Sequence, residues 1–200
     1  MNTLINRLAI LVLFIAFSTL SVTAQKTTMW EADKDHTSVN FSINHFFSSV
    51  TGKFTDFEDD ICFDRENLAD SKIFFTISVN SINTENQKRD KHLKSDDFFD
   101  VETHPTIKFE SNRFEKLSEN EYAIHGKLTI KDITRDVVVP MKITGEMEHP
   151  MMEGTIILGM LIDTTLDRTD YEVGSGDWAS TLVVGDEVRI HIPMELNRMK

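Results

Sequence analysis

The feature that most constrains the fold is a two-residue alternation of apolar and polar side chains that recurs along the chain from residue 37 onward. In residues 37–46, Val39, Phe41 and Ile43 share one face, and small polar side chains occupy the other. The same pattern recurs in residues 72–82, 106–110, 122–130, 137–143 and 188–196. Residues 156–162 are apolar on both faces. One-sided alternation predicts strands of an antiparallel sheet that buries a single face.

A less regular strand near residues 60–64 brings the predicted total to seven or eight strands in one domain. Turn residues separate the strands at residues 48–52, 131–132, 145, 154, 174–176 and 185–186. A sheet of this size exposes its edges unless it closes into a barrel or splits into a sandwich, and alternation is compatible with both. Residues 84–99 interrupt the pattern, because Thr84 and Gln87 fit a capping box that predicts a short helix or ordered crossover.

The first 24 residues are predicted to be a secretory signal peptide. Arg7 precedes an apolar run from Leu8 to Leu20, and the small residues up to Ala24 fit a cleavage site. The run is shorter than the ~20 apolar residues that span a bilayer. We therefore expect a domain of residues 25–200 that is exported to the periplasm, or outside the cell, with no stable membrane insertion after cleavage.

Composition and motifs exclude several classes of function. The chain has 33 Asp and Glu against 21 Lys and Arg, a net charge of −12, which disfavours binding to nucleic acid. Its one cysteine, Cys62, forms no intramolecular disulfide. Neither a nucleophile elbow nor a metal-binding histidine spacing occurs, so we expect no catalysis, no metal and no cofactor. A hydrolase or metal site that uses His45 or His92 is the remaining enzymatic alternative.

Six motifs follow one another along the predicted domain. They are HTSVNFSINH at residues 36–45, VTGKF at 50–54, RDKHLKSDDFFD at 89–100, HPTIKFES at 104–111, GKLTI at 126–130 and VVVP at 137–140. Together they resemble the YceI-like family of exported polyisoprenoid-binding proteins. The resemblance implies an all-β fold, an eight-stranded antiparallel lipocalin-like barrel with a short helix or crossover around residues 84–99. It also implies an apolar pore that binds an isoprenoid quinone or a polyprenyl phosphate. The chain departs from the family pattern at Asp132, Asp136 and Tyr171-Glu172, which concerns the barrel rim.

The in-phase apolar side chains are the candidates to line such a pore. They are Phe41, Ile43, Phe75, Ile77, Phe109, Tyr122, Leu128, Val139, Met141 and Ile190. Taken alone these residues favour a solid core and a structural or interaction domain, whereas the resemblance favours a lipid carrier. His45 shares their phase, so it is predicted to point inward, where it contacts a ligand or bonds to backbone.

Two residues of the predicted crossover are candidates for contact with a lipid headgroup. Arg89 and His92 lie among several lysines, and a phosphate would be held there. One alternative is that Arg89 and Asp90 cap strand ends or tie the crossover to the barrel, and another is that the cationic cluster is a solvated helix face. A homodimer is a further expectation, because barrels with open apolar ends often pair.

Overall fold

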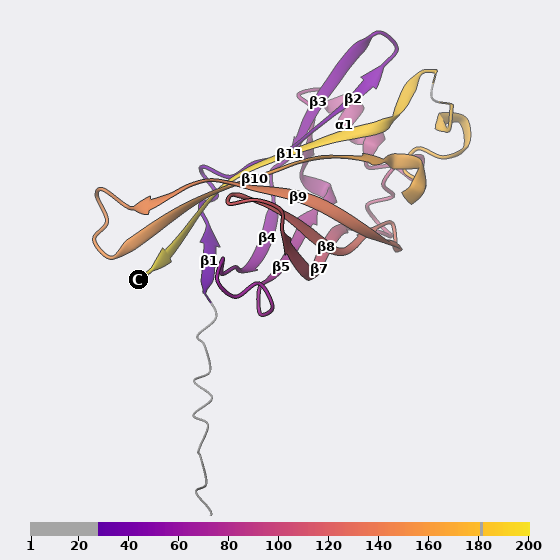
Figure 1. The fold of residues 1–200 in the computed structure, drawn as a ribbon. Coiled ribbons are helices and arrows are strands. Elements are labelled where there is room, and N and C mark those ends of the chain that lie inside the picture. The colour runs from indigo at the N-terminus through magenta and orange to yellow at the C-terminus, as the bar shows by residue number, and fades with distance from the viewer. Residues whose placement is uncertain (1–27, 181) are drawn as a thin grey trace, which may run out of the picture.

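Eleven strands of one antiparallel sheet make up most of the computed structural model, which describes residues 28–180 and 182–200 (Figure 1). The strands are β1 (Met29–Ala32), β2 (Val39–His45), β3 (Ser48–Phe54), β4 (Phe57–Cys62), β5 (Lys72–Ser78), β6 (Ile82–Asn83), β7 (Thr106–Lys116), β8 (Glu121–Ile130), β9 (Ile133–Glu148), β10 (Thr155–Asp167) and β11 (Val184–Met199). The helices are α1 (Gln87–Leu93) and the 3-10 turns η1 (Val79–Ser81), η2 (Arg168–Tyr171) and η3 (Gly176–Trp178). The predicted signal peptide lies outside the described residues.

Eight of these strands form a closed circuit in the order β1-β4-β5-β7-β8-β9-β10-β11. Closure occurs at β1, which pairs with β4 on one side and with the end of β11 on the other. The predicted eight-stranded antiparallel barrel is therefore confirmed. The remaining three strands extend the sheet from the first half of β11. That half pairs with β2, β2 pairs with β3, and β3 pairs with β6. The β2–β3 hairpin and the start of β11 extend from one end of the barrel, and the β9–β10 hairpin and the C-terminus lie at the other (Figure 1).

Several predicted turns are parts of strands. Residues 48–52 lie in β3, and the turn before it consists of Phe46 and Phe47, since His45 pairs with Ser48. Gly145 lies within β9 opposite Gly159 at a register shift, and residues 185–186 lie within β11. Small polar residues and glycine suit the exposed face of a strand as well as a turn, so composition alone does not distinguish the two. The turns at residues 131–132 and 154 are confirmed.

The ends of two other predicted elements also differ from the sequence pattern. The strand predicted over residues 72–82 ends at Ser78 and continues as η1 before β6. The predicted helix exists, but it starts at Gln87 with Asn86 as its N-cap, whose side chain accepts a hydrogen bond from the Arg89 amide at 3.1 Å. Thr84 instead donates to the carboxylate of Asp90 from both its amide and its hydroxyl. No helix among the described residues is long and apolar enough to cross a membrane.

The interior of the barrel has a solid half and a hollow half, and the long strands contribute to both. On β8, Tyr122 and Ile124 are fully buried, whereas Leu128 is only partly covered. The solid half contains aromatic pairs, including Phe63 edge-on to Tyr122 with ring centroids 5.3 Å apart. Its largest buried side chains are Tyr122, Phe63, Ile124, Met141, Leu158, Met160 and Leu196. The hollow half lies toward α1 and the η2–η3 segment.

Candidate functional site

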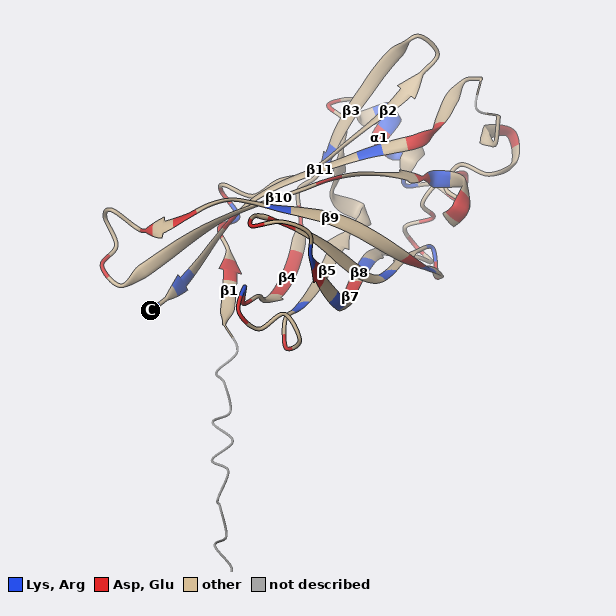
Figure 2. Ribbon diagram, viewed as in Figure 1, with Lys and Arg blue, Asp and Glu red and all other residues tan. Residues whose placement is uncertain are grey.

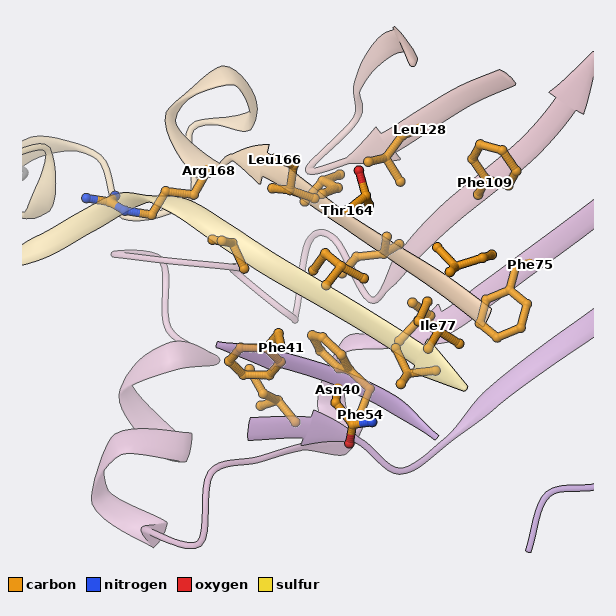
Figure 3. Close-up of a pocket in the computed structure, with 18 of the residues that line it drawn as sticks. Asn40, Phe41, Phe54, Phe75, Ile77, Phe109, Leu128, Thr164, Leu166 and Arg168 are labelled. Carbon is orange, nitrogen blue, oxygen red and sulfur yellow. The ribbon is translucent and has the colours of Figure 1, made fainter. Parts of the chain in front are cut away.

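An apolar cavity of about 220 Å³ occupies the hollow half of the barrel (Figure 3). This volume exceeds the roughly 150 Å³ of an apolar cavity that stays dry and accepts a benzene ring. Inward residues of most strands supply the walls. They include Val39, Phe41, Ile43, Phe54, Ile73, Phe75, Ile77, Ile107, Phe109, Leu128, Val139, Ile162, Leu166, Val184, Val188, Ile190 and Met194. A surface of this kind binds hydrocarbon and excludes water.

Three of the residues that line the cavity have polar side chains: Asn40, Thr164 and Arg168. Asn40 uses both of its amide hydrogens elsewhere, donating to the hydroxyl of Ser38 at 2.8 Å and to the carbonyl of His191 at 3.1 Å. Thr164 lies on the inward face of β10, since it pairs with Ile190 of β11. Its hydroxyl is therefore the neutral polar group that the cavity wall presents to a ligand (Figure 3).

Arg168 closes one end of the cavity with a guanidinium whose five N–H groups all donate to backbone carbonyls. Nε donates to Gly185 at 2.8 Å, and Nη1 donates to Val173 at 2.7 Å and Gly174 at 2.8 Å. Nη2 donates to the carbonyls of residues 178 and 184 at 2.8 and 3.1 Å. The side chain is only 3% exposed, and burial lowers the pKa of Arg168. The guanidinium thus ties the segment after η2 to the start of β11 and has no N–H left for a ligand.

A lid of helix and loop packs over the same end of the cavity. Leu93 of α1 and the following Phe98 and Phe99 reach the cavity wall. The His92 ring lies edge-on to Phe98 and to Trp178, with centroids 5.0 and 4.9 Å away. Phe98 and Phe99, at the end of the crossover, therefore help to close the cavity.

Two glycines let aromatic rings approach the backbone of the barrel wall closely. A Cβ at Gly52 would overlap the Phe41 ring, which comes from the paired residue on β2. A Cβ at Gly126 would lie 2.8 Å from the Phe109 ring and 2.5 Å from a backbone carbonyl. Both glycines fall in motifs singled out from the sequence, and their role here is close approach rather than a turn.

Eight of the eleven predicted lining residues face the cavity. They are Phe41, Ile43, Phe75, Ile77, Phe109, Leu128, Val139 and Ile190. Tyr122 and Met141 are placed elsewhere, in the solid half, where each is 1% exposed. His45, the last residue of β2, is also absent from the cavity wall, although its sheet partner Val184 belongs to that wall; the centroid of its ring lies 4.8 Å from that of Phe46.

Sequence reasoning missed wall residues that precede or follow regular alternation. Phe54 ends β3, and Val184 lies where the pairing of β11 with β2 is irregular. The lid residues Leu93, Phe98 and Phe99 belong to no strand. Their apolar character in a polar stretch was the available signal, and only the fold shows that they cover the barrel end.

The two headgroup candidates, Arg89 and His92, make structural contacts outside the cavity wall. Arg89 donates from Nε to the hydroxyl of Thr84 at 2.7 Å and from Nη2 to its carbonyl at 2.8 Å. His92 pairs with Asp97 through Nε2 at 3.0 Å. These contacts all lie within residues 84–97, so they stabilise the crossover itself.

Within residues 28–180 and 182–200, His36, His45 and His92 do not come together. His36 lies on the turn before β2, His45 at the hairpin end and His92 in α1. His36 instead joins Asp33 and Glu195, and the three ligand atoms lie within 4.8 Å of one another on the outside of the barrel. The hydrogen bond between the His36 ring and the Asp33 carboxylate, 2.8 Å long, raises the pKa of His36 and lowers that of Asp33.

Comparison with known proteins agrees with this architecture. The model of the YceI-like domain matches residues 30–196 of the chain. The chain belongs to the YceI-like family. Among its relatives, a UPF0312 protein of Ectopseudomonas mendocina is 36% identical over 139 residues, which cover 69% of this chain and 72% of that protein. A UPF0312 protein of Pectobacterium atrosepticum is 31% identical over 145 residues, 72% of this chain and 74% of that protein.

Several solved structures share the fold. The YceI protein of Campylobacter jejuni superimposes with a TM-score of 0.69 at 31% identity and covers 77% of this chain and 88% of that one. BcnA of Burkholderia cenocepacia gives a TM-score of 0.73 at 25% identity, with 84% and 100% covered. A polyisoprenoid-binding domain of Saccharophagus degradans, at 14% identity and a TM-score of 0.62, has the same fold over 84% of this chain and 97% of that one.

Proposed function

We propose that this YceI-like protein binds an isoprenoid lipid with a neutral polar end and sequesters or carries it, without catalysis, in the periplasm. The observation that carries the proposal is the apolar cavity inside the barrel, whose walls are hydrocarbon apart from three side chains. A structural neighbour is described as a polyisoprenoid-binding domain, which supports the same class of ligand. The predicted signal peptide supports the compartment.

The apolar lining of the cavity favours a hydrocarbon chain over a polar ligand, and the family resemblance points to an isoprenoid. By volume it accommodates about one or two isoprene units in this conformation. Each buried methylene contributes roughly 0.8 kcal/mol, so a five-carbon unit gains about 4 kcal/mol without any polar contact. A longer chain requires the aromatic side chains of the wall and the lid to move apart.

The polar end of the ligand is proposed to be neutral. A buried phosphate needs hydrogen-bond donors, and every N–H of Arg168 is already engaged by the backbone. The Thr164 hydroxyl offers one hydrogen bond, which suits a quinone carbonyl or an alcohol. Among the two headgroups that the family resemblance implies, the quinone is therefore favoured over the polyprenyl phosphate.

The first test is native mass spectrometry of the full chain expressed in a bacterium with its own leader, followed by solvent extraction of any bound lipid. We expect a stoichiometric isoprenoid adduct. Leu128→Trp fills the cavity and should abolish the adduct, whereas Leu117→Trp, on the exposed turn after β7, should keep it. A bare mass for the wild type, or an adduct that survives Leu128→Trp in a folded protein, would refute the proposal.

The second test concerns the polar end. Thr164→Val keeps the shape of the side chain and removes the hydroxyl. We expect a roughly 2- to 10-fold loss of affinity for an isoprenoid quinone, the equivalent of one neutral hydrogen bond. Affinity for a hydrocarbon such as squalene should not change. Equal losses for both ligands would mean that Thr164 acts through packing.

The filled-core alternative, a structural or interaction domain without a ligand, agrees with only half of the barrel. The solid half is packed as that alternative requires, but the cavity occupies the other half. We therefore favour the lipid carrier.

A further inference from the structure

The turn between β2 and β3 exposes two aromatic residues that the fold does not need there. Phe46 is 58% exposed and Phe47 is fully exposed. Phe46 adopts a φ of +49°, a left-handed conformation that bulky residues rarely adopt and that glycine or asparagine adopts readily. A two-residue hairpin turn normally carries such residues. This turn therefore places a bulky residue in a backbone conformation that disfavours it, and it exposes two apolar side chains to water. Positions that depart from local preferences in this way are often functional.

The β2–β3 hairpin carries no formal charge from its turn as far as Lys53 at its base. Residues 37–52 contain no Asp, Glu, Lys or Arg, although such residues make up 27% of the chain. Figure 2 shows this hairpin without red or blue from its turn almost to its base, whereas β7, β8, β9 and β11 each carry both acidic and basic residues. An uncharged hairpin can enter an environment of low polarity without the penalty of burying an ion.

A second apolar residue stands beside the turn. The amide of Phe46 donates to the carbonyl of Val183 at 3.0 Å, and the neighbouring Leu182 is 83% exposed. We call Phe46, Phe47 and Leu182 the apolar tip. Val184 continues from it, pairs with His45 and lines the cavity. The apolar tip thus lies at the cavity end that Arg168 and the lid close, on the side of the barrel opposite the β9–β10 hairpin (Figure 1).

We propose that the apolar tip inserts into the surface of an electrically neutral lipid bilayer and brings the lid end of the cavity to that surface. Aromatic side chains are favoured at the interface between headgroups and hydrocarbon. The neighbouring segment carries Asp177, Asp186 and Glu187, and the chain as a whole is acidic, so anionic lipid repels it. This inference rests on the proposed function in one respect, since a bilayer is the source or destination of the lipid cargo.

Flotation with phosphatidylcholine vesicles tests this proposal, using the full chain as the bacterium produces it. We expect the wild type to float with the vesicles, and less of it to float when phosphatidylglycerol is included. The variant Phe46→Gly/Phe47→Ser gives the turn the residues its geometry favours, so the fold should be as stable or more stable. Each Phe withdrawn from the bilayer should lower the partition coefficient by at least about tenfold.

The control variant changes apolar residues at the other end of the barrel. Met151→Gly/Met152→Ser removes two exposed methionines from the β9–β10 turn and should leave flotation unchanged. Equal flotation of the tip variant and the wild type, or no flotation of the wild type, would overturn the proposal. Loss of a homodimer in the tip variant, without any vesicle binding by the wild type, would overturn it in favour of a second copy. The lipid adduct is measured without vesicles. A negative flotation result would therefore overturn the membrane proposal alone, and the adduct experiment would still test the proposed function.

Discussion

Replacing Arg168 by methionine tests whether its guanidinium holds the closed end of the barrel. The substitution keeps most of the aliphatic length and removes the donor of five hydrogen bonds, which are 2.7–3.1 Å long. Five carbonyls of residues 173–185 then lose a charged partner in a region that excludes water. The segment between η2 and β11 should loosen first, because Arg168 is what joins its two ends.

The expected loss of stability is about 3–5 kcal/mol in the free energy of unfolding. Hydrogen bonds to charged groups contribute about 1.5–3 kcal/mol each, but they do not add here, because the buried guanidinium carries a desolvation cost of its own. Removal of one partner from a buried charged cluster costs about 3–5 kcal/mol. That is a large fraction of the 5–15 kcal/mol typical of a folded protein.

Urea unfolding and hydrogen exchange measure the two parts of this prediction. Arg168→Met should lower the midpoint and accelerate amide exchange in residues 173–185. Arg168→Lys supplies three donors in place of five and should recover part of the loss. Arg189→Met is the control, since that side chain is exposed on β11, and its change should stay within about 0.5 kcal/mol. A loss below about 1 kcal/mol for Arg168→Met, or unchanged exchange in residues 173–185, would refute the reasoning.

Two further predictions concern the cavity wall and the outside of the barrel. Gly52→Ala should push the Phe41 ring into the cavity, reduce the lipid adduct and cost about 1–3 kcal/mol, whereas Gly145→Ala, whose new Cβ meets nothing within 4 Å, should change neither quantity. Retention of a full adduct by Gly52→Ala would contradict this placement. The pair of Asp33 and His36 should stabilise the fold between two pH limits. The lowered pKa of Asp33 gives stability that is lost as the pH falls below about 3.8, and the raised pKa of His36 gives stability that is lost as the pH rises above about 6.5. An NMR titration of the His36 ring should give a midpoint above 6.5 that falls in Asp33→Asn, and an unchanged midpoint would count against the pair.

The alternation of residues predicted most of the barrel because the period of a strand is local. Each of the predicted strands from residue 106 to the end is present, usually longer than its pattern. The alternation does not predict the short β1, since four residues show too little periodicity. It predicts a turn where β3 lies, because Ser48, Ser49 and Gly52 have turn-like composition. The site was predicted in part by the same means, since alternation identifies which side chains point inward.

The pattern of residues alone indicates the class of fold, the inward face of each long strand and the apolar character of the wall. Which level of the barrel is solid and which is hollow follows from the packing of the folded chain. Tyr122 and Leu128 share a strand and a phase, yet one is packed against Phe63 and the other faces the cavity. The reason is that phase along a strand specifies a side of the sheet, whereas height along the barrel depends on strand tilt and on what covers each end. The lid at Arg168 and the apolar tip at Phe46 arise from such end contacts, between residues far apart in the chain.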